Sequence, residues 1–211
     1  MITIIDYGLG NLASVKRAFN HLNKEVLISS NPEDILKAEK LVLPGVGAFG
    51  QGMENLNSGG LAEAIKESVN KNIPLLGICL GMQLLFSESE EMGNFEGLNL
   101  IPGKVLRLKP DPTLPIKFKV PHVGWSEIFK PSGIEWDKSI LNNINEFSKV
   151  YFVHSFAAKT EDKDVLLSQT EYGGEILCSA VQKNRIVGCQ FHPEKSGPVG
   201  LEILKNFIEW R

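Results

Sequence analysis

The chain has 211 residues and a net charge of −3, from 22 lysines and arginines and 25 aspartates and glutamates. Charges of both signs are dispersed along it, which argues against a nucleic-acid-binding surface, and no apolar run is long enough to span a membrane. The first residues lack the basic start of a signal peptide, so the three cysteines indicate a reducing cytoplasm rather than a disulfide framework. A chain of this length can bury a proper core, and we expect a single domain over residues 1–211.

Short apolar strands alternate with amphipathic helices in the N-terminal part of the chain. The apolar runs predict strands at residues 2–5, 25–29, 40–43 and 73–78. Helices are predicted at residues 12–22, from the start signal Asn31-Pro32, and around residues 61–69. Because strands and helices alternate over residues 1–87, we expect a parallel sheet with helices on both faces.

Two glycines, Gly8 and Gly10, follow the first predicted strand. A dinucleotide-binding loop would need a third glycine, but Ala13 stands in its place, and no acidic residue clearly ends the second strand. We therefore predict a tight strand-to-helix turn here rather than a cofactor site.

The C-terminal part is predicted to be richer in strands. Residues 87–97 are polar and carry four glutamates, which favours a surface loop. Alternating segments then predict strands at residues 104–108, 116–120, 149–156, 165–170, 175–182 and 186–191. Turn signals at residues 172–174 and 183–184 join the last three as hairpins. A closing helix is predicted with an apolar face made of Leu201, Leu204, Phe207 and Ile208. There is no linker or repeat, so both halves are expected to share one core.

A cysteine, Cys79, stands at the end of the fourth predicted strand, between Gly77 and Gly81. Helix-like spacing of apolar residues begins directly after it, and the two glycines let the backbone turn sharply from strand into helix. This pattern predicts the nucleophile elbow of hydrolases, with cysteine in the position that serine has in the hydrolase motif. The sulfur would lie at a helix N-terminus, where the helix dipole favours the thiolate. Cys79 is therefore predicted to be a nucleophile rather than a small buried core residue.

The base that such a cysteine needs is supplied by His192, at the end of the last predicted strand. Pro193 holds His192 in an extended conformation, and Glu194 can reach back to the imidazole. We predict that His192 accepts the thiol proton, while Glu194 orients the imidazole and stabilises its charged form. The His-Pro-Glu sequence alone is a weak signal, but together with the elbow it indicates a Cys-His-Glu triad.

The remaining cysteines and histidines give weaker signals. Cys178 and Cys189 lie in apolar strand segments and are predicted core residues, and His21 is placed to interact with the C-terminus of the first helix. His122 and His154 adjoin loops or strand ends and stay open as functional candidates that the triad does not require. No two histidines have the spacing of metal ligands on one element, so no metal site is predicted.

Several motifs together resemble a known family. The segments 77–83 and 190–194 resemble those of class I, triad-type glutamine amidotransferases. Four further segments resemble, more narrowly, the glutaminase subunits of imidazole glycerol phosphate synthase: residues 6–12, 44–49, 151–155 and 192–196. The resemblance runs from Met1 to Arg211. Cysteine peptidases and γ-glutamyl hydrolases share the elbow, but the first two of these four segments argue against both.

The resemblance implies an α/β fold of the flavodoxin-like class I amidotransferase type. This fold has a central, mostly parallel sheet flanked by helices, with additional antiparallel strands in the C-terminal half. It also implies that glutamine is hydrolysed through a γ-glutamyl thioester on Cys79, with His192 as the base and with backbone N–H groups of Leu80 and Val46 holding the oxyanion. The residues expected to hold glutamine are Gly47, Gln83, Glu91, Ser155 and Phe156. The hydrolysis needs no cofactor.

The same resemblance implies a heterodimer. Ammonia would pass to a separate (β/α)8 cyclase subunit of histidine biosynthesis. In this family, that subunit converts a phosphoribulosyl-formimino-aminoimidazole carboxamide ribotide into imidazole glycerol phosphate and aminoimidazole carboxamide ribotide. Two positions depart from the family pattern: Ser126, where asparagine is usual, and Phe156, where tyrosine is usual. The first lies near the subunit contact in that family and bears on the coupling to the partner.

Two alternatives stay open at this point. Paralogues of this glutaminase supply ammonia for modifying sugars of surface polysaccharides, through a similar barrel. A non-catalytic scaffold with the same fold is the alternative from a different class, but the intact Cys79, His192 and Glu194 argue against it. Neither nucleic acid nor a membrane is expected as a partner.

Overall fold

A seven-stranded sheet forms the centre of the computed structural model, which describes residues 1–210. In spatial order its strands are β11 (Leu166–Tyr172), β12 (Glu175–Lys183), β13 (Ile186–Cys189), β4 (Leu75–Cys79), β3 (Lys40–Gly45), β1 (Ile2–Ile5) and β2 (Val26–Ser29). The strands from β13 to β2 run parallel, whereas β12 is antiparallel to both β11 and β13. This confirms the predicted mostly parallel sheet and the hairpins of the C-terminal half.

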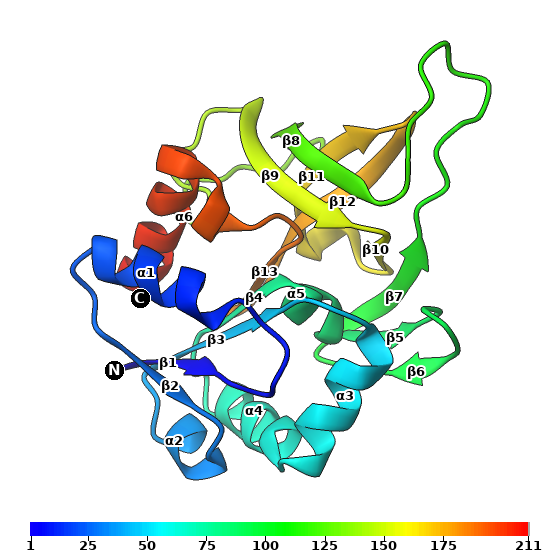
Figure 1. Ribbon diagram of the computed structural model, residues 1–211. Helices are drawn as coiled ribbons and strands as arrows, with labels where there is room; N and C mark the ends of the chain where they lie inside the picture. Colours follow the sequence, from blue (N-terminus) through cyan, green and yellow to red (C-terminus); the bar gives the residue numbers. More distant parts are fainter. Residues whose placement is uncertain (211) are drawn as a thin grey trace.

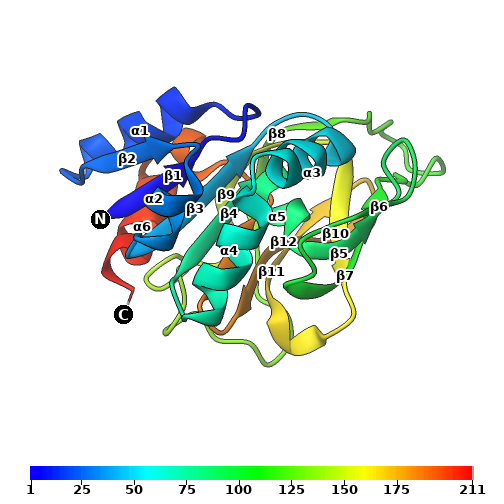
Figure 2. The same cartoon turned by 90° about the horizontal axis from the view of Figure 1, so that it is seen from below.

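Helices cover both faces of this sheet (Figure 1). One face packs against α1 (Leu12–His21) and α6 (Gly197–Glu209), and the other against α2 (Pro32–Leu36), α3 (Phe49–Ser58), α4 (Leu61–Asn70) and α5 (Leu80–Leu84). Figure 2, seen from below, brings α2, α3 and α4 in front of the sheet. Because strand side chains alternate, Ile4 of β1 packs on the α1 side and Ile5 on the α4 side. None of these helices, within the described residues, has the length and apolar character needed to cross a membrane.

Two smaller sheets lie beside the central one. The first contains β10 (Phe156–Thr160), β7 (Ile101–Arg107), β5 (Phe86–Ser89) and β6 (Phe95–Glu96). The second is the antiparallel pair β8 (His122–Ile128) and β9 (Ser148–His154). Short 3₁₀ helices occupy Lys163–Val165 and Pro193–Lys195. Because β9 and β10 pair with different strands, the single strand predicted over residues 149–156 is divided in two at Ser155.

Two other predictions of secondary structure were wrong, and one strand was missed. The polar segment 87–97, predicted as a loop, contributes to β5 and β6, because β5 pairs with β7 and buries its two end residues. Residues 116–120 form no strand, since this alternating segment leaves Ile116 and Phe118 exposed instead of covering a core. Strand β8 was not predicted, because it carries an inverted pattern. Its apolar Val123 and Trp125 are exposed, whereas the polar His122 is buried.

Helix α3 was also missed, because its glycines disfavour a helix. The structure shows what one of them does: a Cβ at Gly52 would lie 3.2 Å from each terminal methyl carbon of Leu84 in α5. The missing side chain therefore lets α3 pack closely on α5, directly behind the predicted nucleophile. Packing, rather than intrinsic propensity, stabilises this helix.

Candidate active site

Cys79 lies where β4 ends and α5 begins, and its backbone takes φ 54° and ψ −110°, as the N-cap of α5. A positive φ is unusual for a residue other than glycine and indicates local strain, which often marks functional positions. The flanking glycines act differently from the prediction, because neither Gly77 nor Gly81 is among the residues with positive φ. A Cβ on Gly81 would overlap the carbonyl oxygen of Leu43 in β3, and one on Gly77 would lie 2.8 Å from the backbone of Met82. The glycines therefore provide space for the elbow, and Cys79 itself makes the sharp turn.

His192 follows β13, the strand beside β4, and its extended backbone (φ −100°, ψ 95°) agrees with the expected effect of Pro193. Its Nδ1 lies 2.8 Å from Oε1 of Glu194, and both side chains are almost completely buried. Because a carboxylate accepts, Nδ1 carries the proton that is donated to Glu194, and Nε2 is left to exchange the catalytic proton. Nε2 is buried and has no hydrogen-bond partner. Nε2 is therefore free to exchange a proton with a neighbouring group.

Burial lowers the pKa of His192, but the neighbouring Cys79 and Glu194 raise it more strongly, to about 9. Cys79 contributes to this raised pKa, although no hydrogen bond is formed between Nε2 and Sγ. Catalytic hydrogen bonds are often incomplete until substrate is bound. The sulfur instead makes long contacts of 3.8 Å to the carbonyl oxygen of Val153 and 3.7 Å to Nε2 of Gln190.

We expect the raised pKa of His192 to make folding stability depend on pH. A histidine whose pKa is raised in the folded state contributes stability that is fully present below its unfolded value of 6.5 and is lost as pH rises through about 9. The free energy of unfolding, measured by urea titration, should therefore fall across this interval. His192→Asn should remove the part of this fall that is due to His192. If the wild type and His192→Asn differ in free energy of unfolding by the same amount at every pH, the raised pKa of His192 is contradicted.

A cavity of about 300 Å³ opens beside Cys79. Its walls include Cys79 and every residue predicted to bind glutamine or the oxyanion, together with three residues that were not predicted. The lining residues are Val46, Gly47, Cys79, Leu80, Gln83, Glu91, Pro121, Val153, His154, Ser155 and Phe156. The unpredicted residues are Pro121, Val153 and His154, of which only His154 carried a sequence signal, as an open histidine candidate. The cavity is open at one side, and its size suits a small amino acid.

Two polar side chains of the cavity are already fixed by the protein. Nε2 of Gln83 donates to the carbonyl oxygen of Phe156 at 2.9 Å and to Oε1 of Gln190 at 3.0 Å, which uses both amide protons. Oε2 of Glu91 accepts from the backbone N–H of Phe49 at the start of α3, at 2.8 Å. Gln190 was not singled out from the sequence, because a glutamine in a strand gives no signal of a buried contact with a sulfur.

The backbone that borders the cavity fits an oxyanion site. Gly45 is the register partner of Cys79 in the pairing of β3 with β4, so the segment that follows Gly45 lies beside the nucleophile. Gly47 has φ +115°, a conformation that other residues rarely adopt, and Val46 is exposed. Leu80 is the first residue of α5, where helix N–H groups have no partner within the helix. The segment and the helix start both line the cavity, and the role of their N–H groups in holding an oxyanion stays a prediction.

The other two cysteines lie outside the proposed triad. Burial raises the pKa of the Cys178 thiol to about 12 and also raises that of Cys189, so both stay protonated and inert at neutral pH. This agrees with their predicted place in the core. A larger cavity of about 490 Å³, between β7, β10, β11 and β12, contains Cys178 but none of the predicted triad. Within residues 1–210, no group of three or more His, Cys, Asp or Glu side chains is arranged to hold a metal ion.

Comparisons with known proteins show what this chain is similar to. The family described as "Glutamine amidotransferase class-I" matches residues 3–210. "Imidazole glycerol phosphate synthase subunit HisH 1" from Legionella pneumophila (strain Paris) is 45% identical over 209 residues, which cover 99% of this chain and 98% of that protein. The subunit HisH from Chlorobaculum tepidum is 43% identical over the full length of both chains, and that from Geobacter metallireducens is 47% identical over 98% of this chain and 96% of its own.

Solved structures resemble the fold at low sequence identity. One described as "Crystal structure of glutamine amidotransferase" has a TM-score of 0.73 at 16% identity and covers 100% of this chain and 98% of its own. The structure of PurLQS from Thermotoga maritima has a TM-score of 0.72 at 17% identity, with 99% and 97% covered. These likenesses show a shared fold and no more.

Proposed function

Because the chain belongs to the class-I glutamine amidotransferase family, we propose that it is the glutaminase subunit of an imidazole glycerol phosphate synthase. The observation that supports this proposal is the geometry of the site: Cys79 at the elbow lines a cavity suited to a small amino acid, and the hydrogen-bonded His192–Glu194 pair follows the neighbouring strand β13. The relatives that are 43–47% identical over almost the whole chain are named as subunits of that synthase, which supports the choice within the family. The surface-sugar paralogue gains no such support.

In the proposed reaction Cys79 attacks the side-chain amide carbon of glutamine, and its proton passes to Nε2 of His192. The negative charge that develops on the amide oxygen is held by the N–H groups of Leu80 and Val46. His192 then returns the proton to the amide nitrogen, and the carbon–nitrogen bond breaks. Ammonia departs, and a γ-glutamyl thioester remains on Cys79. Water, activated by His192, attacks the thioester and releases glutamate and the thiol. Glu194 keeps the imidazole in the tautomer that both halves require.

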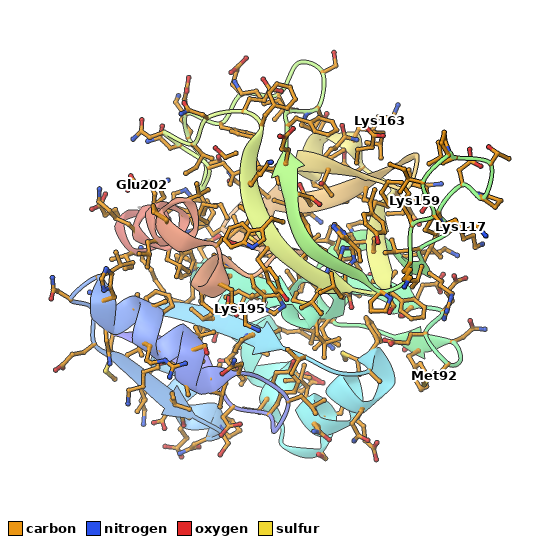
Figure 3. All side chains as sticks on the ribbon, turned by 45° about the horizontal axis from the view of Figure 1, so that its top comes forward. Met92, Lys117, Lys159, Lys163, Lys195 and Glu202 are labelled. Atoms are coloured by element: carbon orange, nitrogen blue, oxygen red, sulfur yellow. The ribbon has the colours of Figure 1, made fainter. Side chains whose placement is uncertain are left out.

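We further propose that the ammonia passes to a separate (β/α)8 cyclase subunit bound beside the cavity. The inverted pattern of β8 supports this docking face, because Val123 and Trp125 are more than half exposed. Their register partners on β9 are Val153, which lines the cavity, and Tyr151. Figure 3 labels Lys195 on the same face, and its Nζ lies 5.9 Å from the centre of the Tyr151 ring. We place the assembly in the cytoplasm, where the three free cysteines would remain reduced.

The proposal predicts that the chain makes a cyclase depend on glutamine. The purified chain would be mixed with the histidine-pathway (β/α)8 subunit of the same genome and the phosphoribulosyl-formimino acceptor, and imidazole glycerol phosphate would be measured. We expect product with glutamine as the only nitrogen source. The cyclase alone, supplied with an ammonium salt, is the control for a competent acceptor and partner. Product from ammonium but none from glutamine plus the chain would contradict the proposal.

A further inference from the structure

Beneath the exposed face of β8 lies a row of polar groups, two of them buried and Ser126 half-buried, that the proposed reaction does not use. Oγ of Ser126 lies 2.8 Å from Nε2 of His122, and Nδ1 of His122 lies 3.1 Å from Nε2 of His154. Nδ1 of His154 lies 2.8 Å from the carbonyl oxygen of Phe156. Both imidazoles are almost completely buried, and His154 lines the cavity beside Cys79.

The carbonyl at one end sets the direction of every bond in this row. A carbonyl oxygen can only accept, so His154 carries its proton on Nδ1 and its Nε2 is an acceptor. His122 must then donate from Nδ1, which leaves its own Nε2 to accept the hydroxyl proton of Ser126. The row is therefore a one-directional chain from the surface strand to the backbone of the cavity.

The chain continues to the nucleophile. The carbonyl oxygen of Phe156 also accepts from Gln83 at 2.9 Å, so both of its lone pairs are occupied. Gln83 donates in addition to Gln190, whose Nε2 lies 3.7 Å from Sγ of Cys79. Five side chains and one carbonyl thus join Ser126 on β8 to the sulfur without a break.

Both histidines are neutral, as this direction requires. Burial is the main cause that lowers the pKa of His122 to about 3 and that of His154 to about 4. A second proton on His154 would lie on Nε2, against the N–H that His122 donates from Nδ1, and two opposed donors in a buried site are costly. His122 is further fixed between two aromatic rings, with its centroid 4.8 Å from that of Phe152 and 3.9 Å from that of Tyr172.

We propose that Ser126, His122 and His154 are positioning residues, whose one-directional chain fixes the Phe156 carbonyl and thereby the glutamine-binding wall of the cavity beside Cys79. The inference rests on the proposed glutaminase function. It assigns a purpose to the buried polar side of β8, where an apolar residue would be expected. The residues act through the wall, since Ser126 and His122 are not among the cavity-lining residues.

The variants at His122 separate hydrogen bonding from packing. His122→Phe keeps a flat ring between Phe152 and Tyr172 but cannot donate to His154. His122→Asn loses the ring, whereas its side-chain amide can donate from nearly the position of Nδ1. If the chain positions the wall, His122→Asn should function better than His122→Phe. If His122 only fills space, the order should be reversed.

The readout is the labelling of Cys79 by two electrophiles, followed by intact mass on the full-length chain. Acivicin, a glutamine analogue, must occupy the cavity before the thiolate displaces its chloride and a carbon–sulfur bond forms. Iodoacetamide reacts by displacement of iodide and needs no such binding. We expect His122→Phe to slow acivicin labelling about tenfold, the effect of losing roughly one buried hydrogen bond, while iodoacetamide labelling stays unchanged and His122→Asn stays close to wild type.

Three further proteins complete the test. Ser126→Ala should slow acivicin labelling less than His122→Phe, and Ser126→Thr, which keeps the hydroxyl, should restore it. These two variants decide the question if His122→Phe fails to fold, as judged by thermal melting. His21→Phe, an exposed histidine at the end of α1, is the matched control and should label as wild type.

Equal acivicin rates in wild type, His122→Phe and Ser126→Ala would overturn the inference and leave the proposed function standing. Faster labelling of His122→Phe than of His122→Asn would also overturn it, in favour of packing. A wild-type chain that reacts with iodoacetamide but never with acivicin would overturn the proposed function, and the inference with it.

Discussion

Replacing Cys79 by alanine should abolish glutamine hydrolysis, with a loss of at least about 10⁴-fold, because the triad acts as a unit and fails without its nucleophile. The fold should persist, since Gly77 and Gly81 still provide the space that the elbow needs and alanine fits the site of the small, buried Cys79 side chain. Glutamate release measures the first expectation, and circular dichroism with thermal melting measures the second.

Two comparisons make this result specific to the sulfur. Cys178→Ala should keep full activity, because that thiol is buried away from the triad and stays protonated. His192→Asn should be as severe as Cys79→Ala, whereas Glu194→Gln should be milder, since misorienting a base costs less than removing it. More than a trace of turnover in Cys79→Ala would show that the nucleophile has been assigned wrongly.

Binding of the cyclase subunit with its acceptor should speed glutamine hydrolysis by about a hundredfold to a thousandfold, the usual value of one oxyanion donor. The structural reason is Val46, which is exposed and lies between Gly45 and Gly47, so its peptide can take two orientations at small cost. Only one orientation presents its N–H to the oxyanion. A partner that favours this orientation therefore acts as a switch.

The switch is tested by steady-state glutamate release with and without partner and acceptor. Val46→Pro has no N–H at this position and should stay at the unstimulated rate even when the partner is bound. Val46→Ala keeps the N–H and should be stimulated like the wild type, which makes it the matched control. Equal rates in the wild type under both conditions would leave a plain hydrolase without this regulation.

Local sequence signals predict the main features of the fold and the residues of the proposed triad. The short apolar runs before Cys79 and before His192 predict strands, and parallel strands place their carboxyl ends at one edge of a sheet. The structure pairs β4 with β13 in parallel and sets Cys189 opposite Ile78, so the two strands that lead to Cys79 and His192 end at the same edge of the sheet. Local signals were sufficient here, because each residue is held by its own strand end and the sheet brings the ends together.

Other features could not be predicted, because the periodicity of apolar residues shows which face of a segment is buried but not which element packs against that face. Helix α3 depends on Gly52 packing against α5, and β8 turns its polar side inward against Phe152 and Tyr172. The role of Gly77 and Gly81 in making space, rather than in turning the chain, likewise depends on neighbours that only the fold provides.

The buried polar chain from Ser126 to Cys79 shows the same limit most clearly. Its bonds connect residues that lie far apart in the sequence, such as His122 with His154 and Gln83 with Gln190. A single histidine or glutamine in a strand has the same local pattern whether it is solvated, packed or bonded. Only the tertiary structure decides its role, because the partner that satisfies a buried donor or acceptor comes from another strand.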